Sequence, residues 1–299
     1  MPVITRRVDS VEADYRCYFC FARTFERLME KHTLTAAEKK ELAAEMFSHF
    51  HNGASGFSVP ALSRELYRLF REKSGVVDPY ERIKYESNDR LLREYGSFRE
   101  KIGHSDDPFE TALRLAIAGN IIDYGVSDQY DLEGTITRVL ESPFAINHAE
   151  QLKQRVADAK TILYLGDNAG EIVFDKLFIE TFHHPNVWYA VRGAPVINDA
   201  TLRDAAQVKM EEVARVIDNG SDAPSTLPEK CSHAFQQLYN EADLVISKGQ
   251  GNLEGLIDAS RDDIYFLLMV KCDVIADRLG VPKGSFVCAS HKLKNEQAG

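Results

Sequence analysis

The stretch that decides the fold reads Tyr164-Leu165-Gly166-Asp167-Asn168-Ala169-Gly170-Glu171-Ile172-Val173. It begins within an apolar, β-type run over residues 161–165, and an amphipathic segment over residues 172–182 follows it. Between the two lies an acid–amide pair, Asp167 and Asn168, with a glycine on each side. This order predicts a strand, a turn and a helix. Open α/β sheets bind their ligands at the carboxyl ends of the strands, so we expect a site at this turn.

Two interpretations of Asp167 and Asn168 follow from the residue types. Carboxylate and amide oxygens are hard ligands that suit Mg²⁺ or Mn²⁺ in proteins. Asp and Asn also form turns and cap helices in many loops, which would make the pair purely structural. The stretch by itself leaves both interpretations open.

Bulk composition limits the classes of partner. The chain of 299 residues is long enough for one or two domains, and its 36 basic and 46 acidic residues give a formal net charge of −10. An acidic balance argues against nucleic acid or an anionic membrane as the main partner. No apolar run approaches the roughly 20 residues that span a bilayer, and residues 1–7 lack the apolar core of a signal peptide. Five cysteines, an odd number, favour a reducing, cytoplasmic setting over a disulfide scaffold.

The sequence changes character about halfway along the chain. The first half has helical patterns, with typical helix starts at Thr35-Ala36-Ala37-Glu38 and Asp107-Pro108-Phe109-Glu110, and we expect no strand before residue 160. After that, short β-rich runs alternate with helical stretches, which indicates βαβ units and a largely parallel sheet. The runs are residues 161–165, 187–191, 213–217, 244–246, 265–270 and 286–289. We place the boundary near residues 142–155.

Polar clusters follow five of the predicted strands. They are Gly166-Asp167-Asn168, Arg192-Gly193 with Asn198-Asp199, Asp218-Asn219-Gly220-Ser221-Asp222, Ser247-Lys248-Gly249-Gln250-Gly251-Asn252, and Lys271-Cys272-Asp273. Each consists of residue types that ordinary loops use. In a parallel sheet, however, all five clusters lie on one edge, where they would share a site.

These clusters divide into metal ligands and a phosphate cradle. Asp167, Asn168 and Asp199 offer hard oxygens and leave coordination positions for water and substrate. The run 247–252 combines glycines, which let backbone amides approach a phosphate, with the charge of Lys248. It is not a Walker A loop, and the acid after Gly166 excludes a dinucleotide fingerprint. A metal next to a phosphate cradle favours phosphoryl hydrolysis.

Two further pairs of residues each allow two interpretations. Cys17 and Cys20 have metal-ligand spacing without a second pair at zinc-finger distance, so either they recruit Cys272 or Cys288 in space or they are buried structural cysteines. Asn120 and Asp123 lie about one helical turn apart and would share a helix face. That face is either a polar helix end or part of a helical portion that reaches over the sheet edge.

Together these blocks resemble the damage-control phosphatase family, long catalogued as domain of unknown function 89. The blocks that carry the resemblance are Gly119-Asn120-Ile121-Ile122-Asp123, residues 166–171, Arg192-Gly193 through Asn198-Asp199, Asp218-Asn219-Gly220 and residues 247–252. The pair Cys17 and Cys20 resembles the prokaryotic branch of that family. Leu253 departs from the pattern, which has an aromatic residue there, whereas Glu254 keeps to it.

The resemblance implies a fold, an activity and a site. The fold is α/β, with a helical portion (residues 1–150) packed on a Rossmann-like three-layer α/β/α domain (residues 151–299) with a largely parallel sheet. The activity is metal-dependent hydrolysis of small phosphometabolites, either sugar phosphates or damaged phosphorylated metabolites, with Mn, Ni, Co or Mg as the divalent metal. The implied metal ligands are Asp167, Asn168 and Asp199, the catalytic residues are Asp167 and Lys248, and the substrate-binding residues are Asn120, Asp123, Arg192, Ser247, Gly249, Gln250, Gly251 and Asn252.

The mechanism and two other functions stay open at this point. Lys248 and the loop amides would stabilise charge on the phosphoryl oxygens, while either water or Asp167 attacks phosphorus. A related branch of the family makes an S-adenosylmethionine-dependent carboxyl methyltransferase an alternative. A non-catalytic protein that binds a sugar phosphate or a metal is the other.

Overall fold

A seven-stranded sheet lies at the centre of the computed structural model, which describes residues 13–52, 58–119 and 132–291. Its strands are β1 (Phe144–Asn147), β2 (Ile162–Leu165), β3 (Val187–Val191), β4 (Arg215–Asp218), β5 (Leu244–Lys248), β6 (Ile264–Met269) and β7 (Phe286–Ser290). The spatial order is β1-β7-β6-β5-β2-β3-β4. All neighbours are parallel except β6 and β7, which are antiparallel. The prediction of a largely parallel α/β sheet is confirmed.

The strand β1 was not expected, because the sequence pattern placed no strand before residue 160. It has only four residues, pairs with β7 at the edge of the sheet, and alternates between half-buried and exposed positions. A short edge strand of this kind forms by pairing with its neighbour and leaves little hydrophobic signal of its own. Five of the six expected strands are nearly all buried along their length, which is why their apolar runs were readable, whereas β4 at the other edge is exposed to half-buried.

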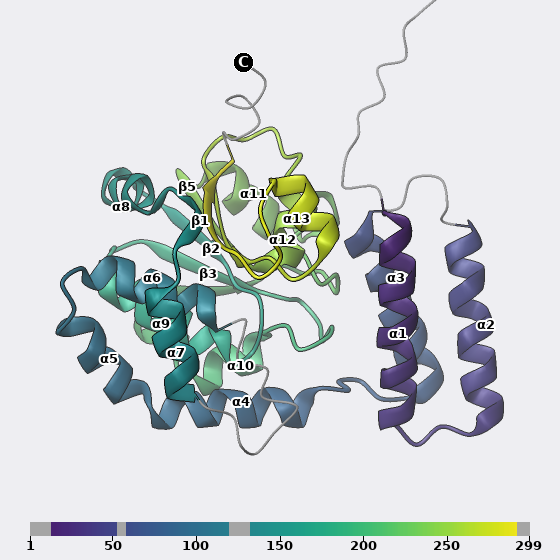
Figure 1. Ribbon diagram of the computed structural model, residues 1–299. Coiled ribbons are helices and arrows are strands. Elements are labelled where there is room, and N and C mark those ends of the chain that lie inside the picture. The colour runs from purple at the N-terminus through teal and green to yellow at the C-terminus, as the bar shows by residue number, and fades with distance from the viewer. Residues whose placement is uncertain (1–12, 53–57, 120–131, 292–299) are drawn as a thin grey trace, which may run out of the picture.

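Helices cover both faces of the sheet, as Figure 1 shows. One face carries α4 (Glu81–Arg93), α5 (Tyr95–Gly103), α6 (Pro108–Ala118), α7 (Leu132–Glu141), α8 (Ala149–Asp158), α9 (Glu171–Phe182) and α10 (Leu202–Gln207), which share one apolar core with the strands. The other face carries α11 (His233–Glu241), α12 (Gly249–Leu256) and α13 (Asp273–Leu279) around a second core. Short 3-10 helices, Met210–Glu212 and Pro228–Lys230, lie in the connections. The three layers are those of an α/β/α domain.

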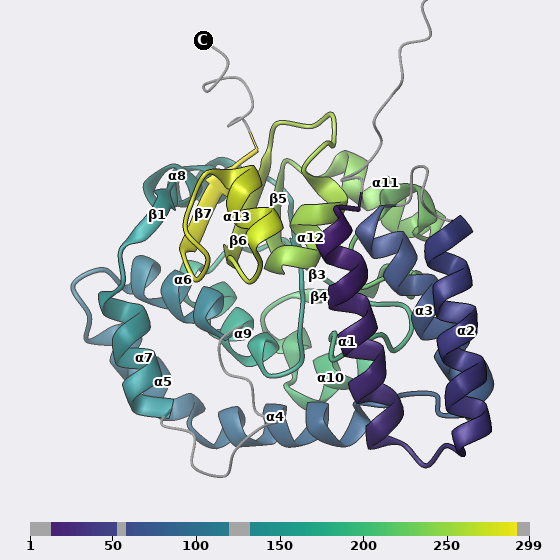
Figure 2. The same ribbon diagram turned by 45° about the vertical axis from the view of Figure 1, so that its right-hand side comes forward.

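The first three helices form a bundle of their own. They are α1 (Tyr15–Lys31), α2 (Ala36–Asn52) and α3 (Val59–Ser74), which surround a third core and stand beside the sheet in Figures 1 and 2. Val196, from the connection that follows β3, is buried inside this core. The bundle therefore contacts the loops at the strand ends. The division at residue 150 stays a prediction, and helices α4–α7, which precede it, share the apolar core on one side of the sheet.

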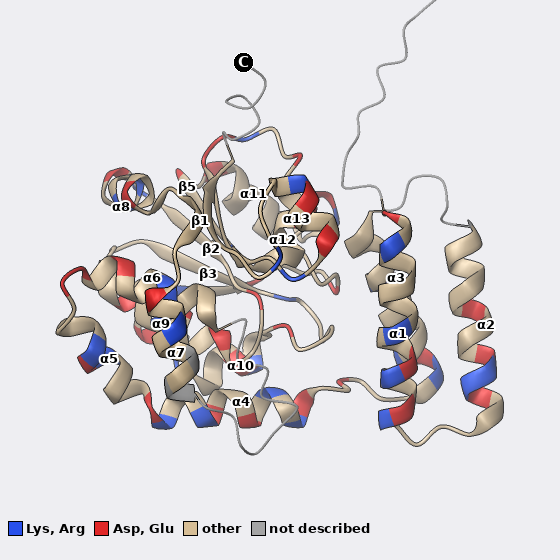
Figure 3. Ribbon diagram, viewed as in Figure 1, with Lys and Arg blue, Asp and Glu red and all other residues tan. Residues whose placement is uncertain are grey.

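Charge is spread over the outside of the molecule. Figure 3 shows acidic and basic residues interspersed along helices α1 to α5. Among the residues that the structure describes, no helix is both long and apolar enough to cross a membrane.

Candidate functional site

The sheet reverses its direction of winding between β2 and β5. The chain passes from β2 outward to β3 and β4, then returns to the other side of β2 for β5 and continues to β6. A crevice forms at the carboxyl ends of two such strands, because their connections leave in opposite directions. Asp167 and Asn168 directly follow β2, and Lys248 ends β5. The predicted metal loop and the predicted phosphate loop therefore meet at this switch point.

Asp199 reaches the same place through backbone pairing. Asn168 and Asp199 form an isolated antiparallel bridge, in which the amide of Ala169 donates to the carbonyl of Asn198 (2.9 Å) and the amide of Ala200 donates to that of Asp167 (2.7 Å). Asp167, Asn168 and Asp199 are all buried. The structure thus brings together the three residues that were predicted as metal ligands.

The turn that precedes Asp199 is fixed by contacts with the α1–α3 bundle. Ile197 adopts a left-handed backbone conformation (φ 46°), which is rare for a β-branched residue. The neighbouring Val196 is buried in the α1–α3 core, and Arg71 of α3 donates to the carbonyl of Pro195 (2.7 Å). The helical bundle consequently fixes the conformation of a loop that carries one of the predicted ligands.

Arg192 lies between the two acids. Its Nε donates to Asp199 Oδ2 (2.6 Å), and its Nη2 is 3.6 Å from Asp167 Oδ1. Its Nη1 donates to Asn252 Oδ1 (3.0 Å), and Nη2 is buried without a hydrogen-bond partner among the described residues. A buried N–H group without an acceptor is expensive, so this atom is suited to a ligand oxygen.

Glu171 orients the amide of Asn168. Nδ2 of Asn168 donates to Glu171 Oε1 (2.7 Å) and to Asp167 Oδ2 (2.9 Å), so the carbonyl oxygen of the amide is the end that can bind a cation. Lys248 Nζ in turn lies 3.3 Å from Glu171 Oε2 and 2.6 Å from Asp175 Oδ1. Glu171 was quoted in the sequence motif without a role, and Asp175 was missed. An acid among the apolar residues of α9, one helical turn after Glu171, is the signal that could have identified it.

Gly249 allows the phosphate loop to approach the metal loop. It opens α12 with a left-handed backbone (φ 77°), and a Cβ atom there would overlap the carboxylate of Asp167. Asn252 closes the loop by donating from Nδ2 to the carbonyls of Lys248 (2.8 Å) and Gly166 (3.1 Å). Gly251 is equally constrained, because a Cβ atom would overlap the carbonyl of Pro224. Both glycines are therefore required by close approach at this edge.

The other predicted residues of this loop point elsewhere. Ser247 lies on the β5 face opposite Lys248, because side chains alternate along a strand, and its Oγ is buried without a partner among the described residues. Gln250 donates to Glu254 Oε1 (2.9 Å) and lies 3.4 Å from Cys272 Sγ. Asn120 and Asp123 lie outside the described residues. Nothing in the structure tests the roles predicted for these four residues.

Burial raises the pKa of Asp167, Asp199 and Glu171. It raises the pKa of Asp167 against the opposing charges of Arg192, Lys271 and Lys248. It raises the pKa of Asp199 to about 7, with repulsion from Asp167 adding to the effect and Arg192 opposing it. The pKa of Glu171 also rises to about 7 by burial, against the charge of Lys248. A bound cation would favour the charged form of all three.

The chemistry of the donor set fits a hard divalent cation. Two carboxylates and one amide oxygen lie on paired loops, and the acids already share the positive charge of Arg192. Within the described parts of the chain, no three His, Cys, Asp or Glu side chains form a metal-binding group. The set would therefore depend on Asn168 and on water or substrate oxygens, as Mg²⁺ sites often do. Cys17, Cys20 and Cys272 are free thiols and form no such metal-binding group among the described residues.

Helix α4 contacts the loop that follows β2 and the loop that carries Asp199, which the sequence analysis did not predict. Asn88 Oδ1 accepts from the amide of Gly170 (2.6 Å), and Lys84 Nζ lies 3.3 Å from the carbonyl of Asp199. Lys84 also pairs with Asp78 (2.9 Å) and Asp204 (3.2 Å), and it is buried. The sequence analysis gave these two residues no role, because no local pattern shows that the polar residues of this charged helix face inward.

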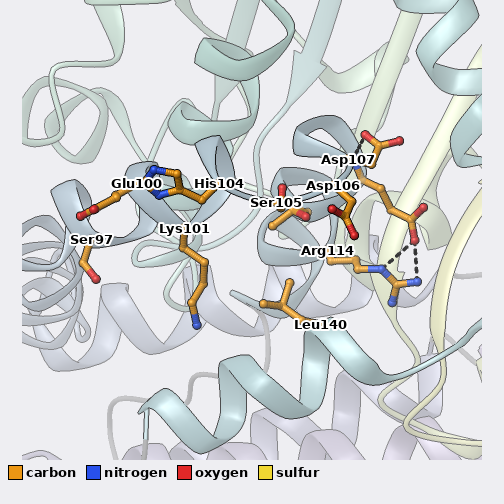
Figure 4. A pocket seen from close by; sticks show the side chains of 11 residues that line it. Ser97, Glu100, Lys101, His104, Ser105, Asp106, Asp107, Arg114 and Leu140 are labelled. Atoms are coloured by element: carbon orange, nitrogen blue, oxygen red, sulfur yellow. Dashed lines mark hydrogen bonds and ion pairs between the residues drawn. The ribbon is translucent and has the colours of Figure 1, made fainter.

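A polar hollow of about 810 Å³ lies away from the strand ends. Figure 4 shows its lining side chains, which come from α5, α6, α7 and the loop before α6. The hollow lies at the N-terminal end of α6, whereas Gly119, which follows the C-terminal end of α6, packs against Glu171. The two ends of this helix are about 15 Å apart, given a rise of about 1.5 Å per residue. Its lining charges are partly paired, as Arg114 is with Glu110 (2.7 Å). None of the described site residues lines it.

Known proteins resemble this chain along most of its length. Residues 13–287 match the family described as damage-control phosphatase ARMT1-like domain. A damage-control phosphatase of Pyrococcus horikoshii is 32% identical over 292 residues, which cover 95% of this chain and 100% of that protein. A damage-control phosphatase of Archaeoglobus fulgidus is 33% identical over 233 residues, which cover 76% of this chain and 80% of that protein. The crystal structure of a DUF89 family protein from Pyrococcus horikoshii is 29% identical, with a TM-score of 0.86, and the match covers 94% of this chain and 99% of that chain.

Proposed function

The chain belongs to the damage-control phosphatase ARMT1-like domain family, and on that premise we propose that it is a metal-dependent phosphatase of small phosphorylated metabolites. Sugar phosphates and damaged phosphorylated metabolites are the substrate classes. The divalent metal is Mn, Co, Ni or Mg. Asp167, Asn168 and Asp199 hold it.

One observation supports the proposal most strongly. The buried acids Asp167 and Asp199 and the oriented amide of Asn168 converge at the topological switch point. They lie next to Gly249, where a Cβ atom would overlap the carboxylate of Asp167. Burying several carboxylates side by side is unfavourable unless a positive charge compensates them. Arg192 compensates in part, and a divalent cation would complete the compensation.

Each residue of the site has a role in the proposed reaction. The bound metal would neutralise charge that develops on the phosphoryl oxygens. Arg192 would donate from its unpartnered Nη2 to one of those oxygens. Lys248 has three ammonium N–H donors, and two point to Asp175 and Glu171, so its third would face the phosphoryl group. The start of α12 at Gly249 adds backbone amides and the positive end of a helix dipole.

Two chemical routes fit this arrangement. In the first, a water molecule oriented by Asp167 or Asp199 attacks phosphorus and gives its proton to the acid, while the ester P–O bond breaks and the leaving oxygen takes up a proton to depart as the alcohol. In the second, a carboxylate oxygen of Asp167 attacks phosphorus and expels the same alcohol, and water then hydrolyses the acyl phosphate to phosphate and the free carboxylate. The residues proposed to bind the substrate also include Asn120, Asp123, Ser247, Gln250, Gly251 and Asn252. Burial around the acids excludes bulk water, which strengthens each charge interaction in the transition state.

The test is a phosphate-release assay on a panel of sugar phosphates and phosphorylated cofactor fragments. The purified chain is assayed with Mn²⁺, Co²⁺, Ni²⁺ or Mg²⁺, and again after treatment with EDTA. We expect turnover that chelation abolishes and metal restores. Turnover that survives thorough chelation would refute the metal role.

A matched pair of variants locates the activity. Asp167→Asn keeps the shape of the side chain and removes its charge, and we expect loss of turnover. Asp106→Asn changes an acid in the distant polar hollow and serves as the control. If Asp167→Asn kept full turnover, the site assignment would be wrong. Calorimetric binding of S-adenosylmethionine, without phosphate release under any metal, would favour the methyltransferase instead.

A further inference from the structure

A carboxylate beneath the proposed ligands has no role in the reaction described above. Asp175 lies in the apolar helix α9 and is fully buried (0% exposed). Its Oδ1 accepts from the hydroxyl of Tyr164 (2.7 Å) and from Lys248 Nζ (2.6 Å), and its Oδ2 accepts from the hydroxyl of Tyr189 (2.8 Å). A buried charge is stable only when it is paired and hydrogen-bonded, and Asp175 satisfies both conditions.

The three donors come from three adjacent central strands. Tyr164 is on β2, Tyr189 is its register partner on β3, and Lys248 ends β5 on the other side of β2. The two tyrosine rings stack at 5.4 Å between centroids. Three strands thus hold one carboxylate, and that carboxylate holds the ammonium group of Lys248 in a single place.

The hydrogen bonds continue from Lys248 to the proposed metal ligands. Lys248 Nζ reaches Glu171 Oε2 (3.3 Å), whose Oε1 accepts from Asn168 Nδ2 (2.7 Å). The same nitrogen of Asn168 donates to Asp167 Oδ2 (2.9 Å). Glu171 and Asp175 are one helical turn apart on α9, so both acids face the strand ends. The chain of contacts is continuous from the tyrosines to Asp167.

We propose that Asp175 is a positioning residue for the metal site. It fixes Lys248, Lys248 fixes Glu171, and Glu171 turns the amide of Asn168 so that its oxygen faces the cation. The inference rests on the proposed function, because it assumes that Asn168 binds a metal. Partners that orient metal ligands in this way typically change metal affinity about 10- to 100-fold when they are replaced.

The test measures metal affinity in the absence of substrate. Mn²⁺ is titrated by calorimetry into the full-length chain after EDTA treatment and dialysis. Asp175→Asn keeps the volume of the side chain and removes its charge, and we expect the Kd for Mn²⁺ to rise about 10- to 100-fold. Glu180→Gln is the matched control, since Glu180 lies on the same helix and accepts from Tyr95 (2.9 Å) without joining the contacts described above. Its Kd should equal that of the wild type.

Two outcomes overturn the inference. An unchanged Kd in folded Asp175→Asn shows that Asn168 is oriented without Asp175. An equal rise in Glu180→Gln shows a general effect of charge on α9. If Asp175→Asn does not fold, Tyr189→Phe replaces it, since that change removes one donor and keeps the charge of Asp175. We then expect a rise of about 2- to 10-fold, the value of one hydrogen bond, and an unchanged Kd overturns the inference.

A double variant tests whether the residues act through one another. If Asp175 acts through Lys248, then Asp175→Asn combined with Lys248→Met weakens Mn²⁺ binding no more than the worse single variant. Losses that add overturn the relay. The readout also separates this inference from the proposed function. A wild-type chain that binds Mn²⁺ without releasing phosphate refutes the function and leaves the inference standing, whereas a wild-type chain that binds no divalent cation refutes both.

Discussion

Gly249→Ala should inactivate the protein while leaving it folded. Gly249 opens α12 with a φ of 77°, and a Cβ atom there would lie 3.0 Å from Cβ of Asp167 and would overlap its carboxylate. The overlapping group is the end of a side chain, so the fold can accommodate the methyl group by rotating that carboxylate away. The rotation removes Asp167 from Asn168 and from the proposed metal.

The structural cost and the functional cost differ in size. An alanine in the left-handed region costs about 1–2 kcal/mol of unfolding free energy. Unfolding entropy of about 2.1 cal/mol/K per residue amounts to about 0.6 kcal/mol/K for this chain, so the melting temperature should fall by about 2–3 °C. Displacing a metal ligand should instead lower Mn²⁺ affinity and turnover by at least about 100-fold, the upper range found for residues that only support a ligand.

The chain offers a control with the same backbone strain. Gly280 caps α13 with a φ of 67°, and a Cβ atom there meets nothing within 4 Å. Gly280→Ala should lose a similar amount of stability and keep the Mn²⁺ affinity and the turnover of the wild type. The assays are thermal unfolding, calorimetric titration of Mn²⁺ and phosphate release. The reasoning fails if Gly249→Ala retains wild-type affinity, or if Gly280→Ala loses as much.

Three further predictions concern residues around the site. Arg192→Met removes the cation that pairs with both Asp167 and Asp199. The unfolding free energy of the metal-free protein should therefore fall by about 3–5 kcal/mol. Mn²⁺ should raise the melting temperature of this variant more than that of the wild type, and an equal rise would contradict this. Val196→Ala removes two buried methyl groups from the α1–α3 core and should lower the free energy of urea unfolding by about 2 kcal/mol. It should also weaken Mn²⁺ binding, because the turn before Asp199 loses packing. Unchanged Mn²⁺ affinity would show that the helical bundle does not fix the conformation of that turn. Burial raises the pKa of Glu254 to about 7, so its stabilising effect is complete below the unfolded pKa of about 4.3 and is lost as the pH rises through 7. In EDTA, Glu254→Gln should therefore reduce the fall in melting temperature between about pH 5 and about pH 8. An unchanged fall would contradict the raised pKa of Glu254 as its cause.

Most of the sheet was predictable because its inner strands are buried on both faces. Such strands carry continuous apolar runs, as residues 162–165 and 264–269 do, and these runs are visible without any neighbour. The edge strand Phe144–Asn147 was missed because pairing with β7 stabilises it more than its own composition does. The family was identified from ordered motifs, and the match over residues 13–287 confirms that identification.

The site was only partly predictable, for a different reason. Asp167, Asn168 and Asp199 could be grouped because parallel strands place their carboxyl ends on one edge. Asn88 and Lys84 could not, since they reach the site from a helix that precedes the sheet by more than 50 residues and their contacts depend on tertiary packing. Lys248 was predicted as the positive charge of the phosphate loop, and its burial (1% exposed) and its ion pairs with two acids were not foreseen. Sequence pattern gave its position in the loop and not its partners.

The central claim is that Asp167, Asn168 and Asp199 hold the divalent cation on which the reaction depends. Anomalous diffraction at the manganese absorption edge, from crystals grown with Mn²⁺, tests it most directly. We predict one strong anomalous peak within coordination distance of these three side chains, at roughly 2.0–2.3 Å from oxygen as hard cations require. A peak at Cys17 and Cys272 instead, or no peak at the carboxyl ends of β2 and β5, would contradict it.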